Sequence, residues 1–139
     1  MSSRDHPAAT QSRRGPVPSM APGGRVSLVG TEHHQVVLHR RRRAAALVVR
    51  GPSVLAELVP EPSNRDDRNA IAVFIGGDRV GYIAKSMTRS LRGALERCVK
   101  AGRAPTCGAA FVVGGPMPRG QVGVDLDVAL DRCGWPKAA

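Results

Sequence analysis

The segment from Glu57 to Lys85 constrains the fold more than any other part of this chain. It begins as an apolar strand, passes through a polar turn, and continues as the apolar run 70–75. Gly76-Gly77 then supplies the positive-φ positions of a tight hairpin, and 79–83 forms the return strand. The polar turn holds four side chains that accept bonds from nearby backbone N–H groups: Asn64, Asp66, Asp67 and Asn69. This pattern predicts a structured loop held on a β-sheet, with the function at the loop.

The rest of the chain completes the prediction of fold class. The strand that opens the central segment spans 53–59, and three more strands are predicted, 25–30, 106–113 and 121–128. In the last of them apolar residues alternate strictly with small or acidic ones, which predicts one buried and one solvated face. In 53–59 the core face is assigned to Val54, Ala56 and Leu58. Six short strands without strand–helix alternation exclude a doubly wound fold and predict a small antiparallel β-barrel, because closure removes exposed edges.

Two helices are expected beside these strands. Residues 35–47 combine a four-Arg block with good helix formers, although 47–49 could equally be strand. Ser86 can cap a second helix that runs to about Ala101, with Gly102 as its terminator. One face of that helix is apolar: Met87, Leu91, Leu95, Cys98 and Val99. The second helix is therefore expected to be amphipathic, to pack on the sheet and to present a basic outer face.

Composition divides the chain into three parts. Residues 1–24 are rich in Pro, Gly, Ser and Arg and hold almost nothing large and apolar, so a disordered tail is expected. The domain is assigned to 25–130, and 131–139 is assigned to a short C-terminal tail. One domain of about 100 residues can bury a real core.

The location and the cofactors are predicted from what the sequence lacks. It has no run of about 18 apolar residues and no apolar secretory-signal core, so no membrane segment is expected. Cys98, Cys107 and Cys133 form no Cys-x-x-Cys pair and are odd in number, which favours a reducing compartment. Cytoplasmic location is therefore predicted. Because no zinc-ligand spacing occurs, neither a metal nor another cofactor is expected.

The formal net charge of +10 is concentrated in two stretches. Residues 25–60 and 85–105 are strongly basic, whereas 61–84 is slightly acidic. Two basic segments that flank a near-neutral centre are typical of a phosphate-binding surface. A solvated, Arg-rich face explains the same numbers equally well.

Three segments of the chain together resemble the HIRAN domain. They are Val29-Gly-Thr-Glu-His-His-Gln35, Glu61-Pro-Ser-Asn-Arg-Asp-Asp-Arg-Asn-Ala-Ile-Ala-Val73 and Val80-Gly-Tyr-Ile-Ala-Lys85. The resemblance covers about residues 25–128. It implies a mainly β fold, a small OB-like antiparallel β-barrel of about six strands with a packed amphipathic helix. It also implies DNA binding. In eukaryotic members, which are attached to SNF2-type fork-remodelling helicases, the domain holds the 3′ end of a single strand.

The resemblance assigns roles to three residues of the central segment. Asp67 corresponds to the carboxylate that accepts a hydrogen bond from a terminal 3′-hydroxyl, Asn64 to its neighbour in the end pocket, and Lys85 to a phosphate contact. A carboxylate in a basic groove repels internal phosphates but accepts from a free hydroxyl, so it selects the end. Asn64 and Asp67 equally fit a turn in which they bind only their own backbone.

Several positions depart from the pattern of end-binding members. Glu32 replaces an Arg, and His33 and Asp66 replace Tyr residues that stack on bases. Tyr82 takes the place of a His and could stack or simply pack, while Arg119 stands in the last hairpin turn where a Phe is expected. Losing stacking platforms costs about 1–3 kcal/mol per base. What remains is a basic rim that as a group favours phosphate: Arg40, Arg41, Arg42, Arg43, Lys85, Arg89, Arg92 and Arg119.

Three functions are weighed on this basis. The first is a monomeric nucleic-acid-binding module that binds single-stranded or forked DNA in repair or fork processing, served by a helicase or nuclease partner. The second is a protein-interaction module that kept the barrel and lost the end pocket, which Glu32 and Asp66 favour. Catalysis is the third and weakest. Four carboxylates could be assembled into a Mg²⁺ site, Glu57, Glu61, Asp66 and Asp67, but the chain lacks a P-loop and Gly-x-Ser-x-Gly, and turn chemistry already explains these carboxylates.

Overall fold

The structure, a computed structural model, describes residues 18–46, 54–114 and 120–130. Its elements follow the order expected from the sequence, with a 3₁₀ helix, η1, added after the first strand. They are β1 Val26–Val29, η1 Thr31–His34, α2 Gln35–Ala46, β2 Val54–Pro60, β3 Ile71–Ile75, β4 Asp78–Ile83, α3 Lys85–Lys100, β5 Thr106–Gly114 and β6 Gln121–Asp127.

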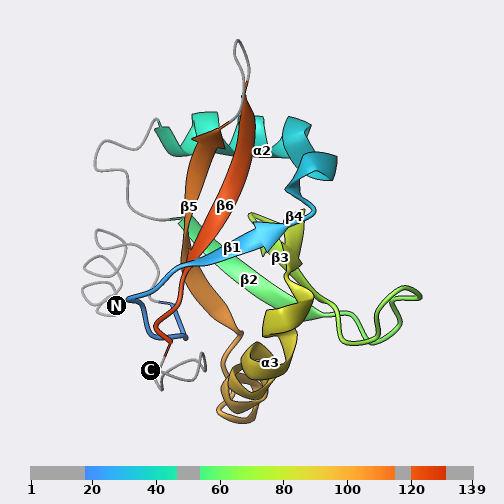
Figure 1. The fold of residues 1–139 in the computed structure, drawn as a ribbon. Helices are drawn as coiled ribbons and strands as arrows, with labels where there is room; N and C mark the ends of the chain where they lie inside the picture. The colour runs from blue at the N-terminus through green and yellow to red at the C-terminus, as the bar shows by residue number, and fades with distance from the viewer. Residues whose placement is uncertain (1–17, 47–53, 115–119, 131–139) are drawn as a thin grey trace, which may run out of the picture.

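The six strands form a closed barrel in the order β1-β4-β3-β2-β5-β6, and every neighbouring pair is antiparallel (Figure 1). This confirms the predicted fold class, a small OB-like antiparallel β-barrel of six strands with a packed amphipathic helix. Closure gives each strand two neighbours, which removes the exposed edges that an open sheet would present. The hairpin between β3 and β4 also forms as predicted, with φ of 60° at Gly76 and 87° at Gly77.

The barrel interior is aliphatic, because alternate residues of each strand point inward. In β2 the side chains of Ala56 and Leu58 are buried while Glu57 is exposed, as the predicted core face requires. In β6 Val122, Val124 and Leu126 are buried, which confirms its predicted alternation. Two buried free cysteines also belong to this core, Cys98 and Cys107. Burial raises the pKa of the Cys107 thiol to about 12, so it is a packing residue and an unreactive thiol.

The two α-helices lie at opposite ends of the barrel (Figure 1). Leu38, fully buried, anchors α2, while Leu91 and Leu95 anchor α3 in the same core. Two details of α3 differ from the prediction. The helix begins at Lys85, so Ser86 lies inside its first turn and does not cap it. Val99, at the edge of the apolar face, is 64% exposed, and Ala94 and Thr88 are buried instead.

The residues just before β1 pack on the barrel. The Ser19 hydroxyl donates to the Ala104 carbonyl at 2.7 Å, and the Met20 N–H donates to the Thr106 carbonyl at 3.0 Å. The Met20 side chain belongs to the buried core. Residues 18–24, which the sequence assigned to the tail, therefore include contacts of the domain, whose start lies before Arg25. None of the helices in the described ranges is long and apolar enough to span a membrane.

Candidate nucleic-acid interface

The loop from Glu61 to Ala70 is fixed by its own polar side chains. The Asn64 Oδ1 atom accepts from the N–H groups of Asp66 at 2.9 Å and Asp67 at 3.1 Å. Asp67 Oδ1 in turn accepts from the Asn69 N–H at 2.9 Å. Asn64 and Asp67 therefore have the loop-stabilising role that the sequence left open. The role of Asp67 in reading a 3′-hydroxyl stays a prediction.

Glu61 joins this loop to the barrel through three partners. Its carboxylate accepts from Tyr82 Oη at 2.9 Å and from Asn64 Nδ2 at 3.1 Å, and it pairs with Arg79 Nη2 at 3.1 Å. The Arg79 guanidinium carbon lies 5.7 Å from the ring centroids of both Phe74 and Tyr82. Burial, followed by the hydrogen bond and negative charge of Glu61, raises the pKa of Tyr82. Tyr82 is thus packed and bonded, with Arg79 over its ring where a base would stack.

We call Glu61, Asn64, Arg79 and Tyr82 the Glu61 cluster. The sequence did not single it out, because Arg79 and Tyr82 follow Glu61 by 18 and 21 positions and become neighbours only when β4 pairs with β3. The Glu-Pro-x-Asn spacing was the available signal, since Asn64 can reach back to Glu61 within one turn. The cluster ties one carboxylate and one guanidinium to each other, so it offers little free charge to a phosphate.

Three other predicted contacts lie on two separate elements, His33 on η1 and Lys85 and Arg89 on α3. His33 is exposed on η1, and its Nε2 lies 3.5 Å from the Glu32 carboxylate. Burial and then the charge of Arg79 lower the pKa of its neighbour His34. Lys85 and Arg89 are exposed in the first turns of α3, where the helix dipole favours anions. Arg119 lies outside the described residues.

Arg41, predicted as a phosphate contact, is held by the β3–β4 hairpin. Its Nη2 and Nε atoms donate to Asp78 Oδ2 at 2.7 and 3.0 Å, and Nη2 also donates to the Gly76 carbonyl at 2.8 Å. Arg40 adds a bond to the same Asp78 oxygen at 3.3 Å. The bond from Arg41, more than any other cause, lowers the pKa of Asp78. Arg41 and Arg40 therefore fasten α2 to the hairpin.

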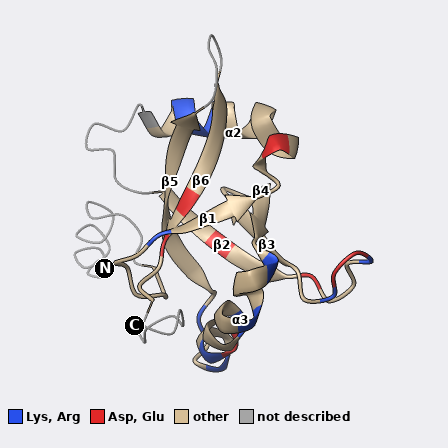
Figure 2. Cartoon of the chain, in the orientation of Figure 1, with Lys and Arg blue, Asp and Glu red and all other residues tan. Residues whose placement is uncertain are grey.

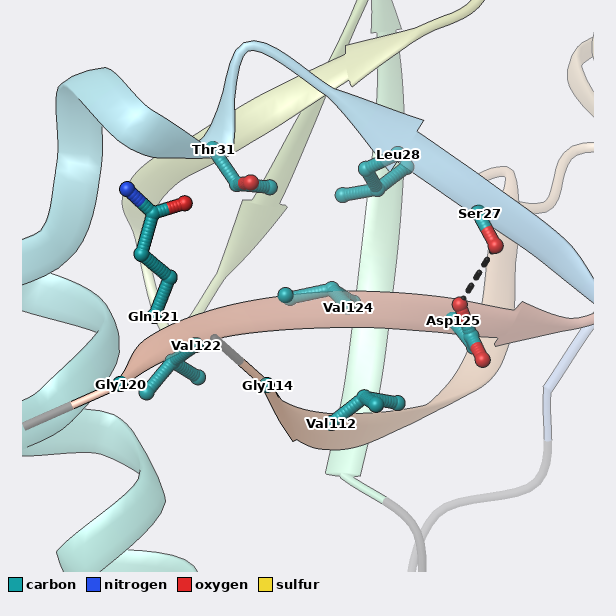
Figure 3. A pocket seen from close by; sticks show the side chains of 11 residues that line it. Ser27, Leu28, Thr31, Val112, Gly114, Gly120, Gln121, Val122, Val124 and Asp125 are labelled. Atoms are coloured by element: carbon teal, nitrogen blue, oxygen red, sulfur yellow. Dashed lines mark hydrogen bonds between the residues drawn. The ribbon is translucent and has the colours of Figure 1, made fainter. Parts of the chain in front are cut away.

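A groove opens where β1 and β6 part. Their ladder holds two pairs, Val26 with Leu126 and Ser27 with Asp125. Beyond these pairs lies a hollow of about 750 Å³ between the two strands (Figure 3). Three glycines line it, Gly114, Gly120 and Gly123. A side chain at Gly114 or Gly123 would meet no atom of the described residues closer than 3.8 Å, so a ligand can approach the backbone there, whereas the Gly114 carbonyl oxygen lies 2.9 Å from the side-chain position of Gly120.

Gln35 bridges β6 and η1, the element that follows β1, at the α2 end of this groove. Its Oε1 atom accepts from the Val122 N–H at 2.9 Å, and its Nε2 donates to the carbonyls of Val122 at 3.0 Å and Thr31 at 2.8 Å. The side-chain amide thus substitutes for a paired strand at Val122. Backbone groups alternate in direction along a strand, so Val124 points its N–H and carbonyl to the same side as Val122, into the groove.

A second hollow continues the groove along α2. It measures about 640 Å³, shares Gly120 and Gln121 with the first, and is lined by His39, Arg42 and Arg43. Arg42 and Arg43 are exposed, and within the described residues neither forms an ion pair. We call the two hollows together the α2 groove. Helical spacing places the four Arg residues on different sides of α2, so the sequence could have shown that Arg40 and Arg41 face another way than Arg42 and Arg43. It did not show which of the two pairs faces the barrel.

The basic residues of α2 and α3 therefore form two separate surfaces, while others lie elsewhere in the described chain, among them Arg25, Arg65, Arg68 and Arg79 (Figure 2). One lies on α2 and the other on α3, at opposite ends of the barrel. The exposed cations of α3 are Lys85, Arg89, Arg97 and Lys100. Asp125 is the acidic residue of the α2 groove, and it accepts from the Ser27 hydroxyl at 2.7 Å.

The acidic side chains of the central loop do not assemble a metal site. Across residues 18–46, 54–114 and 120–130, no three His, Cys, Asp or Glu side chains gather closely enough to hold a metal ion. Glu61, considered from sequence as a possible ligand, is occupied by its three bonds.

Comparison of the chain with protein-family models, curated proteins and solved structures returned no match. The resemblance to the HIRAN domain therefore rests on the sequence segments that carry it and stays a prediction.

Proposed function

We propose that the protein is a nucleic-acid-binding module that binds single-stranded or forked DNA along the α2 groove. The observation that carries the proposal is the pairing of an accessible backbone wall with free cations. Gly123 lines the hollow between β1 and β6, and Arg42 and Arg43, without carboxylate partners in the described chain, line the adjoining hollow along α2. Phosphate contacts supply most of the affinity of non-specific nucleic-acid binding.

Single-stranded DNA fits this surface better than duplex DNA that is read through base-specific contacts. The hollow between β1 and β6 is lined by glycines, aliphatic and short polar side chains, Asp125 and the Gln121 amide, whereas α2 lines the adjoining hollow. Aromatic residues make up 3% of the chain, so stacking contributes little. The binding is therefore expected to be electrostatic, tolerant of sequence and strongly weakened by salt.

A free 3′ end is a further part of the proposal, supported by the resemblance alone. One oxygen of the Asp67 carboxylate holds the loop, and the side chain is partly exposed. The phosphate contact that the resemblance predicts, Lys85, is exposed at the start of α3 and does not line the α2 groove, so it belongs to the end reading and not to binding along the groove. In this proposal the domain contributes no chemistry of its own and recruits a helicase or nuclease.

Fluorescence anisotropy tests both parts of the proposal. The oligonucleotide has about 16 nucleotides, the upper site size of one OB-fold. Three forms of it are compared: one that ends in a 3′-hydroxyl, one that ends in a 3′-phosphate, and a closed circle without a free end. Binding to all three at about 50 mM salt supports the module, and a preference for the 3′-hydroxyl that Asp67→Ala removes supports end reading. An absence of binding to every form at this salt concentration refutes the module. Equal binding of the three forms refutes only the end reading.

The Glu61 cluster favours a second candidate, a protein-interaction module. Arg79 lies over the Tyr82 ring, and Glu61 holds the Tyr82 hydroxyl, so the position expected to face DNA is already filled by the protein. A pull-down that returns one protein partner, with and without nuclease treatment, together with negative anisotropy, would support this candidate over the first.

A further inference from the structure

The opposite end of the barrel carries a hollow of different chemistry. It measures about 550 Å³ and lies between α3 and the ends of the loop that joins β2 to β3. We call it the α3 groove. Its apolar wall is made by seven residues: Pro60, Pro62, Ala70, Ile71, Leu95, Val99 and Pro105. The volume lies in the range of about 300–1,000 Å³ that is typical of small-ligand pockets.

The wall of the α3 groove is rigid. Ile71 and Leu95 belong to the buried core, and Pro60 pairs with Ile71 in the barrel. Pro105 is held by its carbonyl, which accepts from the Leu58 N–H at 3.0 Å. Proline has a fixed φ and no N–H group, so this wall offers apolar contact and few hydrogen bonds. A ligand entering such a preformed groove avoids much of the entropy cost of ordering it.

Val99 marks the groove as incomplete. Its side chain is 64% exposed, although α3 has a well-formed apolar face on Leu91, Leu95 and Cys98. A β-branched residue is a weaker helix former than the charged residues around it. Neither helix propensity nor burial in this chain accounts for a valine there, whereas an apolar ligand that covers it would.

The rim of the groove is positively charged. Arg68, Arg92 and Lys100 line it against one carboxylate, Glu96. In the described chain none of the four forms an ion pair. A ligand that fits both features has one or two apolar side chains for the wall and carboxylates for the rim.

We propose that the α3 groove docks a short acidic segment of a partner protein that inserts one or two large apolar side chains. This interaction is independent of nucleic-acid binding at the other end of the barrel. Single-stranded DNA fits the groove less well, because its wall is made of prolines and aliphatic side chains, which offer few hydrogen-bond donors to phosphates. The chain's own 1–17 and 131–139 segments each carry a net positive charge, so the rim charges oppose them.

Panning a display library of random short peptides on the full chain tests the proposal. We expect the enriched peptides to be acidic and to contain one or two Leu, Ile, Phe or Trp residues. For a synthetic peptide of the enriched sequence, Lys100→Glu should weaken binding by about threefold to tenfold. Val99→Ser should weaken it by about tenfold through lost apolar contact.

Matched variants at the other end of the barrel serve as controls. Val36 is 81% exposed on α2, and Arg42 is an exposed cation there. Val36→Ser and Arg42→Glu should leave peptide binding unchanged. The proposal is overturned if no acidic, apolar peptides are enriched, if the α2 variants weaken peptide binding as much as the α3 variants do, or if an oligonucleotide displaces the peptide. Each of these results is independent of whether the α2 groove binds DNA.

Discussion

The two helix-bearing ends of the barrel carry the same sign of charge and differ in what lies beside it. At the α2 end Arg42 and Arg43 flank glycine backbone and the Gln121 side chain. At the α3 end Arg92 and Lys100 flank prolines and aliphatic side chains. Positive charge attracts phosphates and carboxylates alike, so charge does not decide the ligand. The wall does: accessible backbone suits a nucleic-acid strand, and an apolar wall suits a peptide.

Reversing charge at one end is the strongest way to break this comparison. The double variant Arg42→Glu/Arg43→Glu replaces two attractive contacts with two repulsive ones, so DNA affinity at low salt should fall by about thirtyfold to hundredfold. The slope of log affinity against log salt should shrink by about two. Anisotropy titrations over a salt series measure both. The double variant Arg97→Glu/Lys100→Glu is the matched control, and an equal loss in the two double variants would remove the distinction between the ends.

Removing the Gln35 amide tests whether its bridge between η1 and β6, at the end of the α2 groove, stabilises the fold. Gln35→Ala removes three hydrogen bonds at Thr31 and Val122. The free energy of unfolding in urea should fall by about 1–3 kcal/mol, the cost of leaving part-buried backbone groups unpaired. The exposed Gln121 provides a control of the same residue type. If Gln121→Ala destabilises the protein as much as Gln35→Ala, the bridge has no special role.

Acid should weaken the attachment of α2 to the β3–β4 hairpin through the protonation of Asp78. The bond from Arg41 lowers the pKa of Asp78 below its ordinary value of 3.8. The ionised carboxylate therefore contributes stability above pH 3.8, and this contribution is lost as the pH falls through the lowered pKa of the folded state. Thermal unfolding of the wild type and Asp78→Asn should differ by a constant small amount above that pH and converge below it.

Asp66→Asn is the control for this titration, since Asp66 is exposed and forms no ion pair in the described part of the chain. A wild-type and Asp78→Asn difference that stays unchanged down to the most acidic pH would contradict the assigned role of the Arg41–Asp78 pair.

The smallest expected effect is on stability at Val99. Because Val99 contributes little to the buried core, Val99→Ser should change the free energy of unfolding by no more than about 0.5 kcal/mol. Urea unfolding of this variant beside Val36→Ser measures the change. A loss of several kcal/mol would mean that Val99 is covered within the protein itself, and the α3 groove would not be open to a partner.

The fold could be predicted from the sequence because its signals are local. Gly76-Gly77 has the conformation that a tight hairpin demands, and the alternation in β6 decides which residues are buried. The errors came from single helix ends and faces. Ser86 was taken as a cap although α3 begins one residue earlier, and Val99 was placed on the buried face although it lies at its edge.

The surfaces could be predicted only in part, because they depend on residues distant in sequence. Arg41 and Asp78 are 37 positions apart, so the four-Arg block gave no sign that the Arg41 side chain would be bonded to a carboxylate. The α3 groove likewise joins Pro60 and Pro105 to α3 through barrel closure. The basic stretches were recognised from composition, but composition could not show that they lie at opposite ends of the barrel.

The most direct test of two ends with two ligands is an NMR titration of the isotope-labelled full chain with a single-stranded oligonucleotide at about 50 mM salt, where phosphate contacts are strong. The largest amide shift changes are predicted in Gln35–Arg43 and Gly120–Val124, with Leu95–Lys100 unchanged. The account is contradicted if the shifts are confined to α3, or if the oligonucleotide causes no shift at all.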